Sequence, residues 1–122
     1  MSCRIDYDTR EGLLQAEVSG RSSLGDAAWI ARNIAKEAGR SMLKRVLIDV
    51  RNLADRVGTL ATLALADGSS GRVKGYRVAM VDSGEYDRYY VFAELEARQR
   101  GCRLRRFSDR AAAAAWLKHG YE

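Results

Sequence analysis

The stretch Val46-Leu47-Ile48-Asp49-Val50 decides how this chain folds. It is short, rich in β-branched residues and almost continuously apolar, which is typical of a strand covered on both faces in a parallel sheet. A second run of this kind, Tyr-Arg-Val-Ala-Met-Val, occupies residues 76–81. Between the two runs, Leu60, Leu63 and Ala64 give a short helical period. Strand, helix and strand in this order predict an α/β domain built on parallel strands.

Upstream of this unit the sequence predicts a hairpin and a helix. Alternating apolar and polar residues predict strands over 3–8 and 13–19, joined by a turn at 9–12. A helical period then runs over 26–38, and we expect Gly39 to end it. The hairpin is expected to form an antiparallel edge of the sheet.

Downstream, the pattern predicts a helix over 86–100 ended by Gly101, a strand over 102–107 and a last helix with Ser108 as its N-cap. The predicted order is β-β-α-β-α-β-α-β-α. At 122 residues with 47% hydrophobic content, the chain has the size and composition of one globular domain. We therefore expect a single α/β domain over 1–122, with a mixed, mostly parallel sheet of about five strands flanked by about four helices.

Composition excludes several classes of protein. No apolar run approaches the roughly 20 residues that span a bilayer, and the N-terminus lacks a signal pattern, so we expect a cytoplasmic protein without a transmembrane segment. Cys3 and Cys102 lie far apart without metal-ligand spacing, and His119 is the only histidine. We expect two buried free thiols, no metal and no Cys/His nucleophile.

Cofactor and catalytic motifs are also missing from the sequence. The glycine-rich stretch Gly68-Ser-Ser-Gly71 follows a predicted helix and precedes a strand, the reverse of the order that aims backbone amides at a phosphate. With no nucleophile-base pair or cofactor fingerprint, we expect a protein that is not an enzyme and that uses no cofactor.

Polar residues follow the predicted parallel strands, where ligands commonly meet a sheet of this kind. The candidate site for a ligand or partner comprises Asp49, Arg51, Asn52, Thr59 and Asp82. The competing interpretation is that Asp49 and Asp82 pair with arginines or cap the next helix.

A basic segment is the strongest anomaly of the sequence. Six arginines and one acid lie between residues 98 and 110, giving +5, which equals the net charge of the whole chain. One interpretation is an edge strand whose charges discourage aggregation, and the other is recognition of nucleic acid, phospholipid or an acidic protein. This basic patch is defined as Arg98, Arg100, Arg103, Arg105 and Arg106.

Three segments resemble the STAS/SpoIIAA-like superfamily of small bacterial domains, which is related to anti-sigma-factor antagonists and to the CRAL-TRIO lipid-binding fold. They are residues 46–53, residues 76–82, and residues 104–117 with their Phe-Ser-Asp and Trp-Leu signatures. The resemblance implies a regulatory fold. The Asp-Ser pair of the phosphorylated antagonists is missing, because the corresponding stretch reads Asp55-Arg-Val-Gly-Thr59, in which Thr59 is an expected helix N-cap.

Together, these features predict a non-enzymatic regulatory or binding domain for a protein partner or a small anionic or lipid-like ligand. The partner or ligand is expected at the strand ends or beside the second and third predicted helices. Homodimerisation through a sheet edge or helix face is compatible with this interpretation. The alternative is an electrostatic binder of nucleic acid or a membrane surface through the basic patch, with nucleic acid the less favoured partner. A steep loss of affinity with salt would distinguish the alternative.

Overall fold

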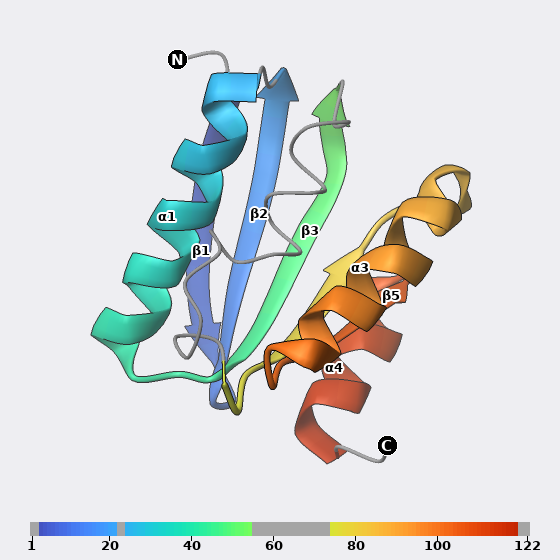
Figure 1. Ribbon diagram of the computed structural model, residues 1–122. Helices are drawn as coiled ribbons and strands as arrows, with labels where there is room; N and C mark the ends of the chain where they lie inside the picture. Colours follow the sequence, from blue (N-terminus) through green and yellow to red (C-terminus); the bar gives the residue numbers. More distant parts are fainter. Residues whose placement is uncertain (1–2, 22–23, 55–73, 120–122) are drawn as a thin grey trace.

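The computed structural model describes residues 3–21, 24–54 and 74–119 and shows an α/β fold (Figure 1). Five strands form one sheet in the order β1-β2-β3-β4-β5, in which β1 and β2 are antiparallel and the later neighbours are parallel. This confirms the predicted mixed sheet with a hairpin at one edge. The elements are β1 (Cys3–Arg10), β2 (Leu13–Arg21), α1 (Leu24–Ser41), β3 (Arg45–Ala54), β4 (Arg77–Val81), the 3₁₀ turn η2 (Gly84–Tyr86), α3 (Asp87–Gln99), β5 (Arg103–Phe107) and α4 (Arg110–His119).

The opening hairpin turns more tightly than its sequence predicts. Arg10 pairs with Leu13, which leaves only Glu11 and Gly12 in the loop. Their φ angles of 55° and 75° are the positive values of a two-residue mirror-image turn, whose twist matches that of the strands. The predicted turn over 9–12 was therefore too long.

Helices α1 and α3 end with the same pattern of backbone hydrogen bonds around a residue of positive φ. Of the two predicted helix ends, Gly39 and Gly101, only Gly101 was right. At the end of α3 the N–H of Cys102 donates to the carbonyl of Ala97, and Gly101 has a φ of 82°, as predicted. The prediction for Gly39 was wrong, because α1 continues through it to Ser41. The same pattern of bonds there uses Met42, with a φ of 59°, as the left-handed residue.

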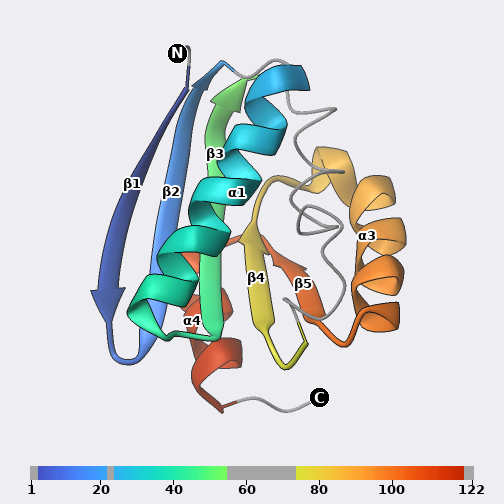
Figure 2. The same ribbon diagram turned by 60° about the vertical axis from the view of Figure 1, so that its left-hand side comes forward.

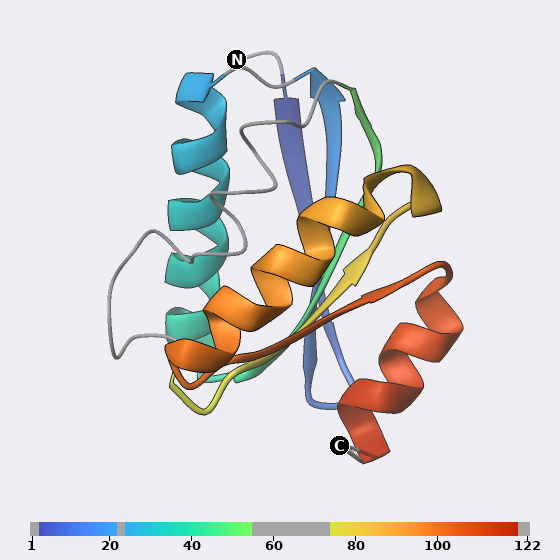
Figure 3. The same cartoon turned by 45° about the vertical axis from the view of Figure 1, so that its right-hand side comes forward.

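Two apolar cores lie on opposite faces of the sheet, and the helices divide between them (Figure 3). The first face is covered by α1 and α3, whose buried residues include Ile30, Ile34 and Tyr90. On the second face, only α4 among the described helices contributes buried residues. Its core consists of Leu13, Leu47, Ala79, Val81, Ala113 and Leu117.

A bulge in β3 places two polar residues side by side. Glu17 pairs with Asp49 but Ser19 pairs with Asn52, so β3 carries one extra residue. Val50 and Leu53 both lie in the core under α1 and α3. Arg51 and Asn52 fit between them and are exposed.

Other predictions concern the helices and the cysteines. The predicted helix at 60–66 lies outside the described residues, in which three α-helices are present. The N-cap prediction for Ser108 was wrong, because the carboxylate of Asp109 accepts the N–H of Ala112 at 2.8 Å. Cys3 and Cys102 are buried and take part in no disulfide in the described part of the chain, as predicted. In the described part of the chain, no helix is long and apolar enough to cross a bilayer.

Candidate functional site

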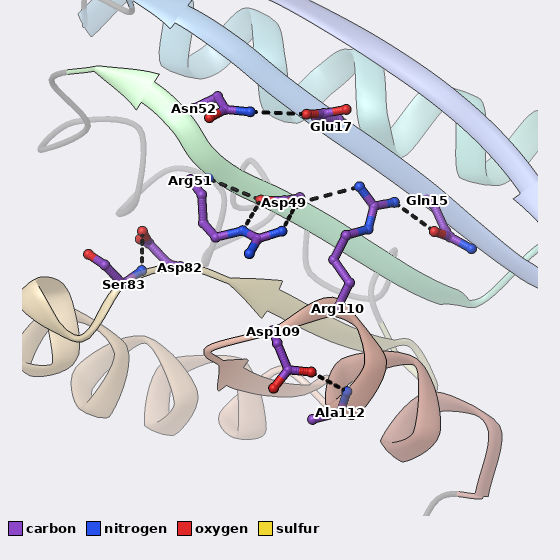
Figure 4. Close-up of polar contacts among 10 residues, drawn as sticks. All are labelled: Gln15, Glu17, Asp49, Arg51, Asn52, Asp82, Ser83, Asp109, Arg110 and Ala112. Carbon is purple, nitrogen blue, oxygen red and sulfur yellow. Dashed lines mark hydrogen bonds and ion pairs between the residues drawn. The ribbon is translucent and has the colours of Figure 1, made fainter.

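The strand-end rim is where the predicted site residues lie (Figure 4). Asp49 lies at the middle of β3, Arg51 and Asn52 lie in its second half, and Asp82 directly follows β4. Thr59, with its suggested capping role, lies outside the described residues. Four of the five candidates are therefore placed near the carboxyl ends of adjacent parallel strands.

Asp49 is buried and is held by two arginines. Arg51 donates from Nε to Oδ1 at 3.1 Å and from Nη2 to Oδ2 at 2.8 Å, and its backbone N–H donates to Oδ1 at 3.1 Å. From the start of α4, Arg110 donates to Oδ2 of Asp49 at 3.4 Å and to Oε1 of Gln15 at 2.7 Å. The carboxylate thus connects β2, β3 and α4.

Opposing effects act on the ionisation of Asp49. Burial alone raises the pKa of its carboxyl group, because the charged form loses hydration. The hydrogen bonds from Arg51 and the positive charges of Arg51 and Arg110 together outweigh burial, so the pKa lies below its usual value. Asp49 is therefore a stable anion at neutral pH and a poor proton donor or acceptor.

Asp82 is also enclosed by internal donors. Its exposed fraction is 0%. The hydroxyl of Tyr90, in α3, donates to Oδ2 at 2.8 Å, and the backbone N–H of Ser83 donates to Oδ1 at 2.8 Å. These contacts connect the end of β4 to the first turns of α3. The interpretation of Asp82 as a helix cap was wrong, because Ser83 and Tyr86 hold the N-cap positions of η2 and α3.

Asn52 is the most accessible polar contact of the rim. Its amide donates to Oε2 of Glu17 on β2 at 3.1 Å, and the contact is exposed. The rim therefore turns its two aspartates inward, while Arg51 and Asn52 face solvent. Such an arrangement suits recognition of a partner rather than proton transfer. Among the described residues, no group of three His, Cys, Asp or Glu side chains could hold a metal ion.

Partners from distant parts of the chain complete the rim, and the sequence did not reveal them. Gln15, Glu17, Tyr90 and Arg110 were not among the candidates, although each bonds to a rim residue or to its partner. One signal was available for Arg110. A positive charge at the first position of a helix opposes the helix dipole, which indicates a nearby carboxylate.

The residues of the basic patch lie on two elements, the end of α3 and the strand β5. β5 is an edge strand, which confirms the predicted position. The guanidinium of Arg106 makes contacts within the protein: it donates to the carbonyl of Asp82 at 2.9 Å and forms an ion pair with Asp87 at 2.7 Å. Arg105 lies over the ring of Phe107, with Cζ 5.5 Å from the ring centroid. Arg98 and Arg100 lie at the end of α3, and Arg103 begins β5.

An exposed apolar surface on α3 was not predicted. Val91, Phe92 and Leu95 expose 72%, 61% and 54% of their areas, and Tyr89 is exposed beside them. Their spacing of three and four residues puts them on one helix face, opposite the buried residues Tyr90, Ala93 and Ala97. The helical period over 86–100 was visible in the sequence, but not which of its apolar residues stay exposed.

Two solved structures resemble this fold over nearly their whole length. An anti-sigma factor antagonist from Mycobacterium paratuberculosis has a TM-score of 0.64 and 17% identity, covering 96% of this chain and 95% of its own. An uncharacterised protein with a SpoIIAA-like fold from Shewanella loihica has a TM-score of 0.54 and 19% identity, covering 95% and 93%. No protein-family model matches the sequence, and no curated protein matches it. The chain has a STAS/SpoIIAA-like fold, as the resemblance implied.

Proposed function

We propose that this protein is a non-enzymatic regulatory domain of the cytoplasm that binds another protein through the exposed apolar surface of α3. That surface, formed by Val91, Phe92 and Leu95, is the observation that carries the proposal. Large apolar side chains gathered on one face mark interaction sites when they remain in contact with water. The fold shared with an anti-sigma factor antagonist, a protein described by its action on another protein, supports the same class of function.

The charges around this surface favour a different protein over a second copy. Arg88 and Arg98 are exposed one turn beyond either end of the apolar residues. An antiparallel pairing of two copies centred on these residues would bring Arg88 of one copy opposite Arg98 of the other. Like charges repel there, so the surface suits a partner with an apolar centre and an acidic rim.

Site-specific crosslinking followed by affinity measurement tests this function. A photoreactive phenylalanine analogue at position 92, in cells of the native host, should crosslink one protein that the same analogue at position 42 does not. With that protein purified, Phe92→Asp should weaken binding about thirtyfold, as expected for a central contact residue. Met42→Asp is the matched control, because Met42 is 87% exposed on another surface and its positive φ suits aspartate.

Other outcomes would contradict the proposal. A crosslink only to a second copy would assign the surface to a homodimer. Binding unchanged in Phe92→Asp but lost steeply with salt would favour the electrostatic alternative. The strand-end rim stays a predicted second contact surface. Measuring partner binding by Asn52→Ala tests it, because this substitution removes none of the hydrogen-bond donors to Asp49.

A further inference from the structure

The two edges of the sheet differ in how they are covered. At one edge, the backbone N–H of Arg106 in β5 donates to Oε2 of Glu94 in α3 at 3.3 Å, so a side chain covers that edge. The other edge is β1, and in the described part of the chain no strand pairs with its outer side (Figure 2). An uncovered edge presents backbone N–H and C=O groups that can pair with another strand.

β1 lacks proline, a bulge and an inward-pointing charge, three features that commonly protect an edge strand. Its eight residues contain no proline and pair with β2 in one continuous register. On the first face of the sheet its residues are Cys3, Ile5, Tyr7 and Thr9, all uncharged. Tyr7 is 38% exposed there, and Ile5 is only partly buried. An added strand would therefore find both an open backbone edge and apolar side chains to cover.

The charges of β1 lie on the second face and are balanced only weakly within one chain. Arg4, Asp6, Asp8 and Arg10 alternate with the uncharged residues. Asp6 lies directly opposite Glu17 of β2, and like charges at such positions destabilise a sheet. Arg4 pairs with Asp6 at 3.2 Å, but the two side chains are 74% and 54% exposed, so the pair contributes little. A positive charge on the outer side of Asp6 is therefore favourable.

The order of these charges restricts how two copies of β1 can pair. Two copies related by a twofold axis perpendicular to the sheet pair as antiparallel strands, and the residue on the axis faces itself. An axis at Asp6 or Asp8 therefore places two aspartates opposite each other. An axis at Tyr7 places Arg4 opposite Arg10 and Asp6 opposite Asp8. Each of these registers opposes like charges, which disfavours it.

A twofold axis at Ile5 avoids this repulsion. It places Arg4 of each copy opposite Asp6 of the other, so the favourable pair occurs twice. Asp6 then has a positive charge on the side away from β2. On the first face, the two Ile5 side chains lie opposite each other and Tyr7 lies opposite Cys3, which brings apolar neighbours to the exposed ring of Tyr7. An axis nearer either end of β1 pairs fewer residues.

We propose that β1 is the homodimer interface of this protein, with the twofold axis at Ile5 and Arg4 paired with Asp6 of the second copy. The two sheets join edge to edge into one continuous sheet. The paired segment is short, so we expect weak association, with a dissociation constant of about 10–100 μM. The interface does not include the α3 surface, so this proposal and the proposed function can fail independently.

Sedimentation velocity at protein concentrations of about 1–500 μM tests the proposal. We expect the wild type to change from monomer to dimer over this range. Asp6→Arg places arginines opposite each other at two symmetric positions and should weaken dimerisation at least about tenfold. Asp8→Arg is the matched control, because Asp8 forms the same kind of pair with Arg10 on the same face but lies beyond the paired segment. It should change the dissociation constant less than about threefold.

A charge exchange separates an effect on pairing from an effect on folding. Arg4→Asp combined with Asp6→Arg restores opposite charges across the interface and should restore dimerisation to the wild-type level. The proposal is overturned if the wild type stays monomeric up to about 500 μM. It is equally overturned if Asp8→Arg weakens dimerisation as much as Asp6→Arg, or if the charge exchange fails to restore it.

Disulfide crosslinking tests the register independently. In the proposed register a cysteine at position 7 faces Cys3 of the second copy, and the Cβ atoms of directly opposite residues lie about 4.5–5.5 Å apart, near the spacing of a disulfide. Tyr7→Cys should therefore form a covalent dimer on oxidation, and adding Cys3→Ser should abolish it. Thr9→Cys is the control, because position 9 faces Cys3 only when the axis lies at Asp6. A covalent dimer from Thr9→Cys but not from Tyr7→Cys would overturn the register.

Discussion

Replacing Asp49 with asparagine tests whether one buried carboxylate holds the sheet to α4. The substitution keeps the size of the side chain but removes the charge that faces Arg51 and Arg110. Hydrogen bonds to charged groups contribute about 1.5–3 kcal/mol each, but both arginines stay partly hydrated. We therefore expect the free energy of unfolding to fall by about 2 kcal/mol. With an unfolding entropy of about 2.1 cal/mol/K per residue over the whole chain, the Tm should fall by about 8 °C.

Acid should remove this difference between wild type and variant. The pKa of Asp49 is lowered in the folded protein, so its contribution is complete above the unfolded pKa of about 3.9 and is lost as the pH falls through the folded value. Below that value the wild-type carboxyl group is neutral, as asparagine is. The two proteins should then unfold at nearly the same urea concentration.

Urea unfolding at pH 7 and at pH 2 provides the measurement, with Asp6→Asn as the control. Asp6 also pairs with an arginine two residues away, Arg4, but both side chains are exposed, so its loss should change stability by less than about 0.5 kcal/mol. An Asp49→Asn protein as stable as the control at pH 7, or a difference that does not shrink between pH 7 and pH 2, would refute the role of this carboxylate.

Three further predictions follow from individual contacts. Burial raises the pKa of Cys102 to about 11, so the native protein at pH 8 should react with Ellman's reagent far more slowly than the unfolded chain, and rapid native reaction would contradict it. Arg106→Met should lower the free energy of unfolding in urea by about 1–2 kcal/mol, because its bonds to the carbonyl of Asp82 and to Asp87 are lost, whereas equal stability would show them dispensable. Gly101→Ala should cost about 1 kcal/mol or more by thermal unfolding, since its φ is 82° and a Cβ would lie 3.2 Å from Lys74 Cγ; an unchanged Tm would mean that the turn adapts.

The strands and their order were predictable because their signals are local. The runs at 46–50 and 76–81 are too apolar for any position but the interior of a sheet. β3 contains the first run, and β4 contains all of the second except Tyr76. The arginines of 103–107 do not fit an interior strand, which correctly indicated an edge. Apolar content and alternation thus determine most of the topology.

Helix ends were less predictable because neighbouring residues compete for the same role. Ser108 and Asp109 are both good N-caps, but Asp109 takes the role while the hydroxyl of Ser108 accepts a hydrogen bond from Arg106. Gly39 did not end α1, and Met42 took the left-handed conformation that sequence reasoning reserves for glycine or asparagine. Differences in backbone hydrogen bonding of this kind leave almost no trace in composition.

Functional surfaces were the hardest to predict, because they depend on which face of an element stays uncovered. The rim was located from strand ends, yet the contact between Gln15 and Arg110 joins residues 95 positions apart. The alignment of Arg45, Arg77 and Arg103 was not predicted for the same reason, because these residues become neighbours only through the register of the sheet. On α3, the period of apolar residues was visible, but not that part of it stays in water.

The unequal cover of the sheet has a consequence during synthesis of the chain. On the second face the apolar side chains of Leu13, Leu47, Ala79 and Val81 are buried with those of α4. On the ribosome, those strands emerge before residues 110–119, so their apolar face stays open until the last helix has left the exit tunnel. A chain truncated before α4 would keep that face exposed, and chaperones and proteases that bind apolar surfaces would recognise it as unfinished.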